Sequence, residues 1–83
     1  MPPRRHKPAR SPDLAALGEA IRRLRLEMGI SQEVLAERAD TDLSQVGGIE
    51  RGRRNPSYTT LRKLAAALET TVGAIASLAD EIR

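Results

Sequence analysis

Residues 29–68 read GISQEVLAERADTDLSQVGGIERGRRNPSYTTLRKLAAAL, and this stretch decides the fold. Capping residues and glycines divide it into short segments, in which apolar residues recur at spacings of three and four. Ser31 is placed to begin one short helix and Asp42 to begin another, with Gln45 three residues further on to complete a capping box. Gly52 is placed to end that second helix. The pattern predicts two short helices joined by a tight turn.

Further helices precede and follow this pair. Ser11 is placed to cap a first helix, with Pro12 at its first position and Gly29 at its end. Ser57 and Thr71 are placed to cap a fourth and a fifth helix. The sequence shows no strand alternation, repeat, phosphate-binding loop or metal-ligand spacing. We therefore predict an all-α fold, a compact domain of five helices.

The composition argues against an enzyme. The chain has 83 residues, no Cys and a single His, which removes thiolate catalysis, disulfides and the usual zinc ligands. That histidine, His6, lies among Pro and Arg residues, so a His-based acid–base site is not expected. No apolar run reaches the roughly 20 residues that cross a bilayer, and no signal peptide is recognisable. We expect a cytoplasmic protein without cofactor, metal, membrane or small-molecule ligand.

The basic residues gather in three places, one of which is Arg22, Arg23 and Arg25, although the net charge is only +3. Residues 1–12 hold four basic residues, no acidic residue and four of the five prolines, which predicts a disordered arm. Such an arm either contacts DNA or merely aids solubility. The second group is Arg51, Arg53, Arg54, Arg62 and Lys63. It suits a phosphate backbone, with a solvated face as the alternative.

The predicted third helix has a side with almost no bulk. Val46 and Ile49 point to the core, and the opposite side carries Ser44, Gly47, Gly48 and Arg51. Each glycine costs a helix about 1 kcal/mol relative to alanine, so either close approach of another backbone or plain tolerance must explain the pair. We predict that this side stays open to duplex DNA. The prediction of DNA binding depends on this side being open.

From about Leu17 to Ile75 the chain resembles the XRE family of helix-turn-helix regulators, the phage Cro and repressor group. The resemblance is carried by Ser31, Gln32, Leu35, Ala36, Val46, Ile49, Glu50, Gly52, Asn55, Pro56, Leu61, Ala65 and Leu68. It implies a lambda-repressor-like fold with a helix-turn-helix motif at about residues 32–51. It also implies binding to double-stranded DNA and transcriptional regulation. A narrower likeness is to restriction–modification controllers.

The resemblance implies that the third helix enters the major groove. Leu43 and Ser44 would read base edges there, and Gln45 would lie at the flank. Many family members have polar residues where this chain has Gly47 and Gly48, so we expect sparse direct readout, with DNA shape adding specificity.

Phosphate contacts are implied on both sides of that helix. Gln32, together with the amide end of the second helix, would hold one phosphate, and Arg51, Arg54 and Asn55 would grip the backbone. The full predicted DNA-binding set is Gln32, Thr41, Leu43, Ser44, Gln45, Gly47, Gly48, Arg51, Arg54 and Asn55.

Two further features follow from the resemblance. Family members often pair an arginine at the position of Arg25 with a glutamate at that of Glu50, which predicts a structural ion pair. Glu69 stands where the family usually has glycine, so we expect the fourth helix to be closed less sharply.

The last helix, at about residues 72–83, carries an apolar stripe made of Ile75, Leu78, Ala79 and Ile82. The stripe either folds back on the core or meets the same stripe of a second chain. We predict a homodimer through it, with residues 1–12 as the arm and 13–83 as the complete DNA-binding domain. The alternative function is an antitoxin, whose last helix covers a partner protein and whose DNA binding is secondary.

Overall fold

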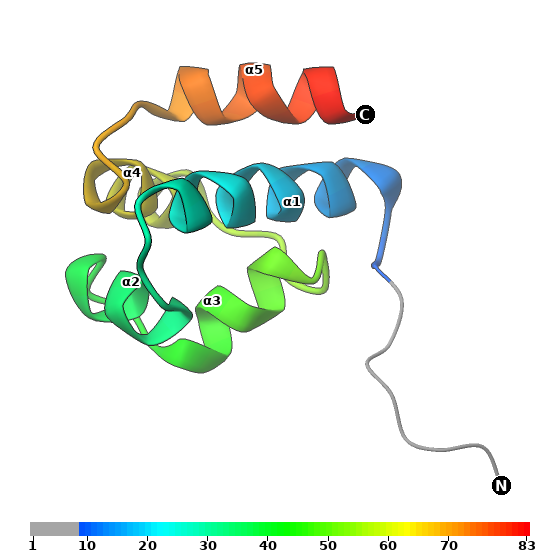
Figure 1. Cartoon of the computed structure of the whole chain (residues 1–83). Coiled ribbons are helices and arrows are strands. Elements are labelled where there is room, and N and C mark those ends of the chain that lie inside the picture. The colour runs from blue at the N-terminus through cyan, green and yellow to red at the C-terminus, as the bar shows by residue number, and fades with distance from the viewer. Residues whose placement is uncertain (1–8) are drawn as a thin grey trace, which may run out of the picture.

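The computed structural model describes residues 9–83, and in this part of the chain the secondary structure consists of five helices (Figure 1). They are α1 (Pro12–Glu27), α2 (Gln32–Arg38), α3 (Leu43–Glu50), α4 (Tyr58–Ala67) and α5 (Val72–Ile82). The predicted all-α fold is therefore confirmed. None of these helices is long and apolar enough to cross a membrane.

The fold begins earlier than the predicted boundary at residue 13. Pro12 is already the first residue of α1, and the N–H of Arg10 donates to the carbonyl oxygen of Gly52 at 2.9 Å. The chain entering α1 is thus tied to the end of α3. Residues 1–8 of the predicted basic arm lie outside the described residues.

Each helix begins at the capping residue that the sequence predicts. The side chain of the cap accepts a hydrogen bond from the N–H three residues further on at Ser11, Ser31, Asp42, Ser57 and Thr71. These bonds satisfy N–H groups that have no partner within the helix. At α3 the N–H of Gln45 donates to Asp42 at 2.8 Å, which is one half of the predicted capping box. The side-chain oxygen of Gln45 is engaged by another residue, described below.

The first four helices all end in the same way. The residue after the C-cap has a positive φ, and the two N–H groups that follow the C-cap return to carbonyls of the last turn. Glycine holds the positive-φ position after α1 and α3, at Gly29 and Gly52, whereas Asp40 and Glu69 hold it after α2 and α4. The expectation of a looser end at Glu69 is therefore wrong. With φ 57°, this residue closes α4 by the same two hydrogen bonds as a glycine would.

The core takes at least one large, fully buried side chain from each helix. These residues are Ile21, Leu35, Ile49, Leu64 and Ile75, with Val46 as a second one from α3, each at most 1% exposed. All of them lie at apolar positions of the predicted helices, whereas Val34, which the same periodicity assigns to the buried stripe of α2, is 37% exposed. Burying them removes apolar surface from water, which is the main favourable contribution to folding.

Helix α1 lies in the middle of the molecule, with α5 along one side and α2 and α3 on the other (Figure 1). The approach of α3 is unusually close at Gly18. A methyl group on this residue would lie 2.3 Å from the carbonyl oxygen of Ile49 and 2.6 Å from that of Glu50. Since both atoms belong to backbone, only glycine fits at this crossing. This packing sets the position of α3 relative to the core.

Candidate nucleic-acid interface

The first turn of α3 presents its side chains to solvent. Leu43 is 47% exposed, Ser44 is also exposed, and Gln45 is half-buried. An exposed leucine at the start of a polar helix face has no partner in the core to explain it. The structure thus places the two predicted base-reading residues, Leu43 and Ser44, together with the flanking Gln45 on the outer surface of the helix-turn-helix. Their contacts with bases remain predictions.

The glycine side of α3 is not open, which corrects the prediction made from the helix wheel. Gly47 and Gly48 are both buried. The side chain of Arg54 lies across Gly48, where a methyl group would come within 2.8 Å of its Cγ and Cδ atoms. The end of the Arg51 side chain lies beside Gly47, where a methyl group would be 3.0 Å from Nη1. The helix wheel failed because it ignores side chains that arrive from the following loop.

Arg54 ends among the predicted base-reading residues. Its guanidinium donates to the side-chain oxygen of Gln45 at 3.0 Å and to the hydroxyl of Ser44 at 3.1 Å. This explains why Gln45 does not complete the capping box. The atoms that cover the glycine side therefore belong to arginine side chains that are themselves exposed and predicted to contact DNA, so openness in the free protein was the wrong criterion for DNA binding.

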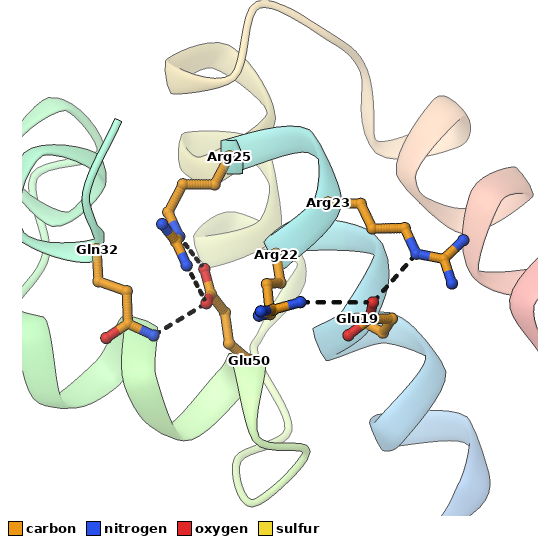
Figure 2. A network of polar contacts seen from close by, with 6 residues as sticks. All are labelled: Glu19, Arg22, Arg23, Arg25, Gln32 and Glu50. Carbon is orange, nitrogen blue, oxygen red and sulfur yellow. Dashed lines mark hydrogen bonds and ion pairs between the residues drawn. The ribbon is translucent and has the colours of Figure 1, made fainter. Parts of the chain in front are cut away.

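Behind α3, Arg25 and Glu50 form the predicted ion pair. Nε and Nη2 of Arg25 donate to the two carboxylate oxygens of Glu50 at 2.7 Å and 3.0 Å (Figure 2). Nη1 of Arg25 also donates to the carbonyl oxygen of Ile30 at 2.9 Å. The Glu50 side chain is 2% exposed and that of Arg25 is 10% exposed. The pair thus joins the end of α1 to the end of α3 and to the loop before α2.

The environment of Arg25 favours its charged form. The hydrogen bonds with Glu50 raise the pKa of the Arg25 guanidinium, and the opposing effect of burial is smaller. Among the described residues, no buried side-chain nitrogen or oxygen lacks a hydrogen-bond partner. A two-point contact between planar groups also fixes their orientation. Helix α3 is consequently held in one rotation relative to α1.

Gln32 belongs to the same network. Its Nε2 donates to Glu50 at 2.9 Å, so the first residue of α2 is connected to the last residue of α3 (Figure 2). The family resemblance implied a phosphate contact for Gln32 and did not indicate this bond. The amide has a second N–H and is half-buried, so the bond to Glu50 orients the group and leaves the predicted phosphate contact open.

The remaining predicted DNA contacts surround α3. Arg51 and Asn55 are exposed in the segment that follows the helix, and Thr41 is half-buried in the turn before it. A second polar network, in which Glu19 contacts Arg22 and Arg23, lies on the exposed face of α1 (Figure 2). Exposed pairs of this type contribute little to stability. Within residues 9–83, no cluster of acidic, His or Cys side chains is suited to a metal ion.

The apolar stripe of α5 folds back on its own chain. Ile75 is 1% exposed in the core, so its predicted place in a dimer seam is wrong. Leu78, Ala79 and Ile82 pack against the core and remain half-buried. The short core of the domain needs this cover, which explains why the stripe is used within the chain.

The comparisons with known proteins agree with this geometry. A family model described as helix-turn-helix matches residues 21–75. The restriction-modification controller protein C.AhdI from Aeromonas hydrophila is 43% identical, with a TM-score of 0.77, over 78% of this chain and 98% of that chain. The controller protein C.Esp1396I is 30% identical, with a TM-score of 0.78, over 86% and 91% of the two chains.

Two relatives extend the comparison. The immunity repressor protein of Bacillus phage phi105 is 42% identical over 59 residues, which cover 71% of this chain and 41% of the repressor. The chain thus spans about two-fifths of that relative's length. The HTH-type transcriptional regulator y4dJ of Sinorhizobium fredii is 37% identical over 65 residues, or 78% of this chain and 84% of the regulator. The resemblance to XRE-type proteins is confirmed: this chain belongs to the helix-turn-helix family of DNA-binding transcriptional regulators.

Proposed function

We propose that the chain binds an operator in double-stranded DNA as a homodimer and thereby regulates transcription. The observation that carries this proposal is the pairing of an exposed first turn of α3 with a rigid support behind it. Leu43 and Ser44 face solvent, while Glu50 at the other end of the same helix is clamped by Arg25. A helix that is fixed on its inner side and polar on its outer side is suited to the major groove.

Base recognition in this proposal begins at the first turn of α3. The Ser44 hydroxyl can donate to or accept from several base edges, and Leu43 can contact a thymine methyl group. Gln45 lies beside them and can reach an adenine or a phosphate. Because only these short side chains face outward from the turn, we expect DNA shape to contribute part of the specificity.

Phosphate contacts in this proposal flank the base-reading turn. Arg51, Arg54 and Asn55 are exposed after α3, and the Gln32 amide lies at the start of α2. Cations and amide donors at these places neutralise or hydrogen-bond the DNA backbone and set the register of the protein on the duplex.

The homodimer is proposed to use the outer part of α5. Leu78, Ala79 and Ile82 keep part of their surface exposed, and Ala76 beside them is exposed. Two copies related by a twofold axis would present their α3 helices to half-sites about 34 Å apart.

In vitro selection from a random duplex library tests the operator part of the proposal. We expect a palindromic site whose binding weakens steeply with salt, since log K falls by about 0.9 per phosphate contact for each unit of log[salt]. A flat salt response, or no selected site, would contradict it.

Sedimentation tests the dimer. Ala76→Arg is expected to give a folded monomer, whereas Ile75→Glu would disturb the core and is unsuitable. An Ala76→Arg protein that remains dimeric would move the interface away from α5. The antitoxin alternative has no observation in its favour, since the relatives described above are named as repressors, regulators and controllers.

A further inference from the structure

The side chain of Arg54 is held along its whole length on the surface of α3. At its base, the N–H groups of Arg53 and Arg54 both donate to the carbonyl oxygen of Gly48, at 2.8 Å and 3.2 Å. At its tip, the guanidinium donates to Gln45 and Ser44. Between these points the side chain of Arg54 lies directly over Gly48.

The crossing requires a residue without a side chain. A methyl group on Gly48 would lie 2.8 Å from Cγ and Cδ and 2.9 Å from Nε of Arg54. These atoms belong to the middle of a flexible, exposed side chain, so an added Cβ would displace Arg54 and leave the backbone in place. At Gly47, by contrast, an added Cβ would approach Nη1 of Arg51 at 3.0 Å, where only the far end of a side chain must move.

We propose that Gly48 is a positioning residue for DNA recognition, because it is the seat that places the Arg54 guanidinium between Ser44 and Gln45. On this view the three side chains act as one unit, and discrimination between DNA sequences depends on all of them. In addition to the backbone contact proposed above, Arg54 thereby acts together with Ser44 in base recognition. Glycine at position 48 destabilises the helix but leaves room for the side chain of Arg54. This inference rests on the proposed function.

The test compares Gly48→Ala with Gly73→Ala, the same change in α5, outside the predicted DNA-binding residues, where a methyl group would make only an ordinary contact with Oγ1 of Thr71 at 3.8 Å. The probes are the duplex that the unaltered chain selects from a random library and versions of it with one base pair changed in a half-site. The measured quantity is the ratio of the two dissociation constants from fluorescence anisotropy. We expect Gly48→Ala to lower this discrimination about tenfold, and Gly73→Ala to change it less than about twofold.

A double-mutant cycle shows whether the effect acts through Arg54. In an Arg54→Ala background, Gly48→Ala is expected to change the discrimination less than about twofold. The melting temperature of the single variant Gly48→Ala should be no lower than that of the unaltered chain, because alanine favours a helix more than glycine does.

The outcomes separate this inference from the proposed function. If the unaltered chain selects no duplex, the proposed function fails. If it selects one, the inference is overturned when Gly48→Ala discriminates as well as the unaltered chain. It is overturned equally when the effect persists without Arg54, or when Gly48→Ala lowers the melting temperature.

Discussion

Two arginines contact α3 from opposite sides, and their surroundings differ. Arg25 reaches the inner side, where it pairs with a Glu50 side chain that is 2% exposed. Arg54 lies on the outer side, where it is exposed and donates to the neutral side chains of Ser44 and Gln45. Each arginine contacts side chains of α3 through two nitrogens of its own guanidinium group. The burial of the contact and the charge of the partner therefore separate their roles.

One helix can therefore be held firmly by contacts on one side and weakly by contacts on the other. Breaking a buried ion pair destabilises the fold, because the remaining charged group is left without a partner in a poorly solvated place. An exposed contact adds little to stability. The inner contact thus sets the position of α3, and the outer contact contributes little to the free energy of unfolding.

Glu50→Ala should break the inner side with the largest effect. Removing the carboxylate leaves Arg25 buried without its partner, and we expect the free energy of unfolding to fall by about 3–5 kcal/mol. Urea denaturation followed by circular dichroism measures this loss. The double variant Arg25→Met/Glu50→Leu should recover most of it, and a loss below about 1 kcal/mol in the single variant would show that the pair is solvated.

Gly52→Ala tests the left-handed residue that directly follows the C-cap of α3. The residue has φ 73°, and a methyl group on it would lie 2.8 Å from Cβ of Ala9 and 3.0 Å from Cα of Ala15. We expect a loss of about 2 kcal/mol in the free energy of unfolding, from the left-handed backbone and the contact together. Gly73→Ala, in open surroundings on α5, is the control and should not destabilise. Equal effects would refute the argument.

Glu69→Gly sharpens the same comparison in the opposite direction. Glu69 adopts the left-handed conformation at the end of α4 that Gly52 adopts at the end of α3. Replacing it by glycine removes the strain but adds freedom to the unfolded chain, so we expect a net gain of about 0.5–1 kcal/mol. Thermal unfolding should show a higher melting temperature. A lower one would mean that the Glu69 side chain makes a contribution that outweighs its backbone strain.

Arg54→Ala probes the outer side and should have the smallest effect on stability. Because the side chain is exposed, we expect the free energy of unfolding to change by less than about 0.5 kcal/mol. DNA affinity should nevertheless fall. If the variant unfolded as readily as Glu50→Ala, the contrast between the two sides of α3 would be lost. Glu19→Gln, which removes an exposed carboxylate from α1, is the matched control.

The helix boundaries and the core could be predicted from the sequence because they depend on local features. Ser31 and Asp42 cap α2 and α3 through bonds to N–H groups three residues away, and the spacing of Leu35 and Ile49 alone indicates their burial. Each of these features spans less than two helical turns. The Arg25–Glu50 pair, 25 residues apart, was reached only through the family resemblance.

Two of the predictions that failed depend on how separate helices pack together. The closure of α4 at Glu69 depends on how completely its last turn is packed, since packing can hold a residue in an unfavourable conformation. The burial of Ile75 depends on α5 lying along α1, which the stripe on α5 could not distinguish from a second chain.

By itself, the sequence determined the five helices, their caps, the apolar positions and the family, since each is written in residues a few positions apart or in a recognisable pattern. Only the tertiary structure decided which surface of α3 is available. The path of Arg54 over Gly48 and the clamp of Arg25 on Glu50 arise when separate elements pack together. Such contacts depend on three-dimensional distance, which periodicity along one helix does not encode.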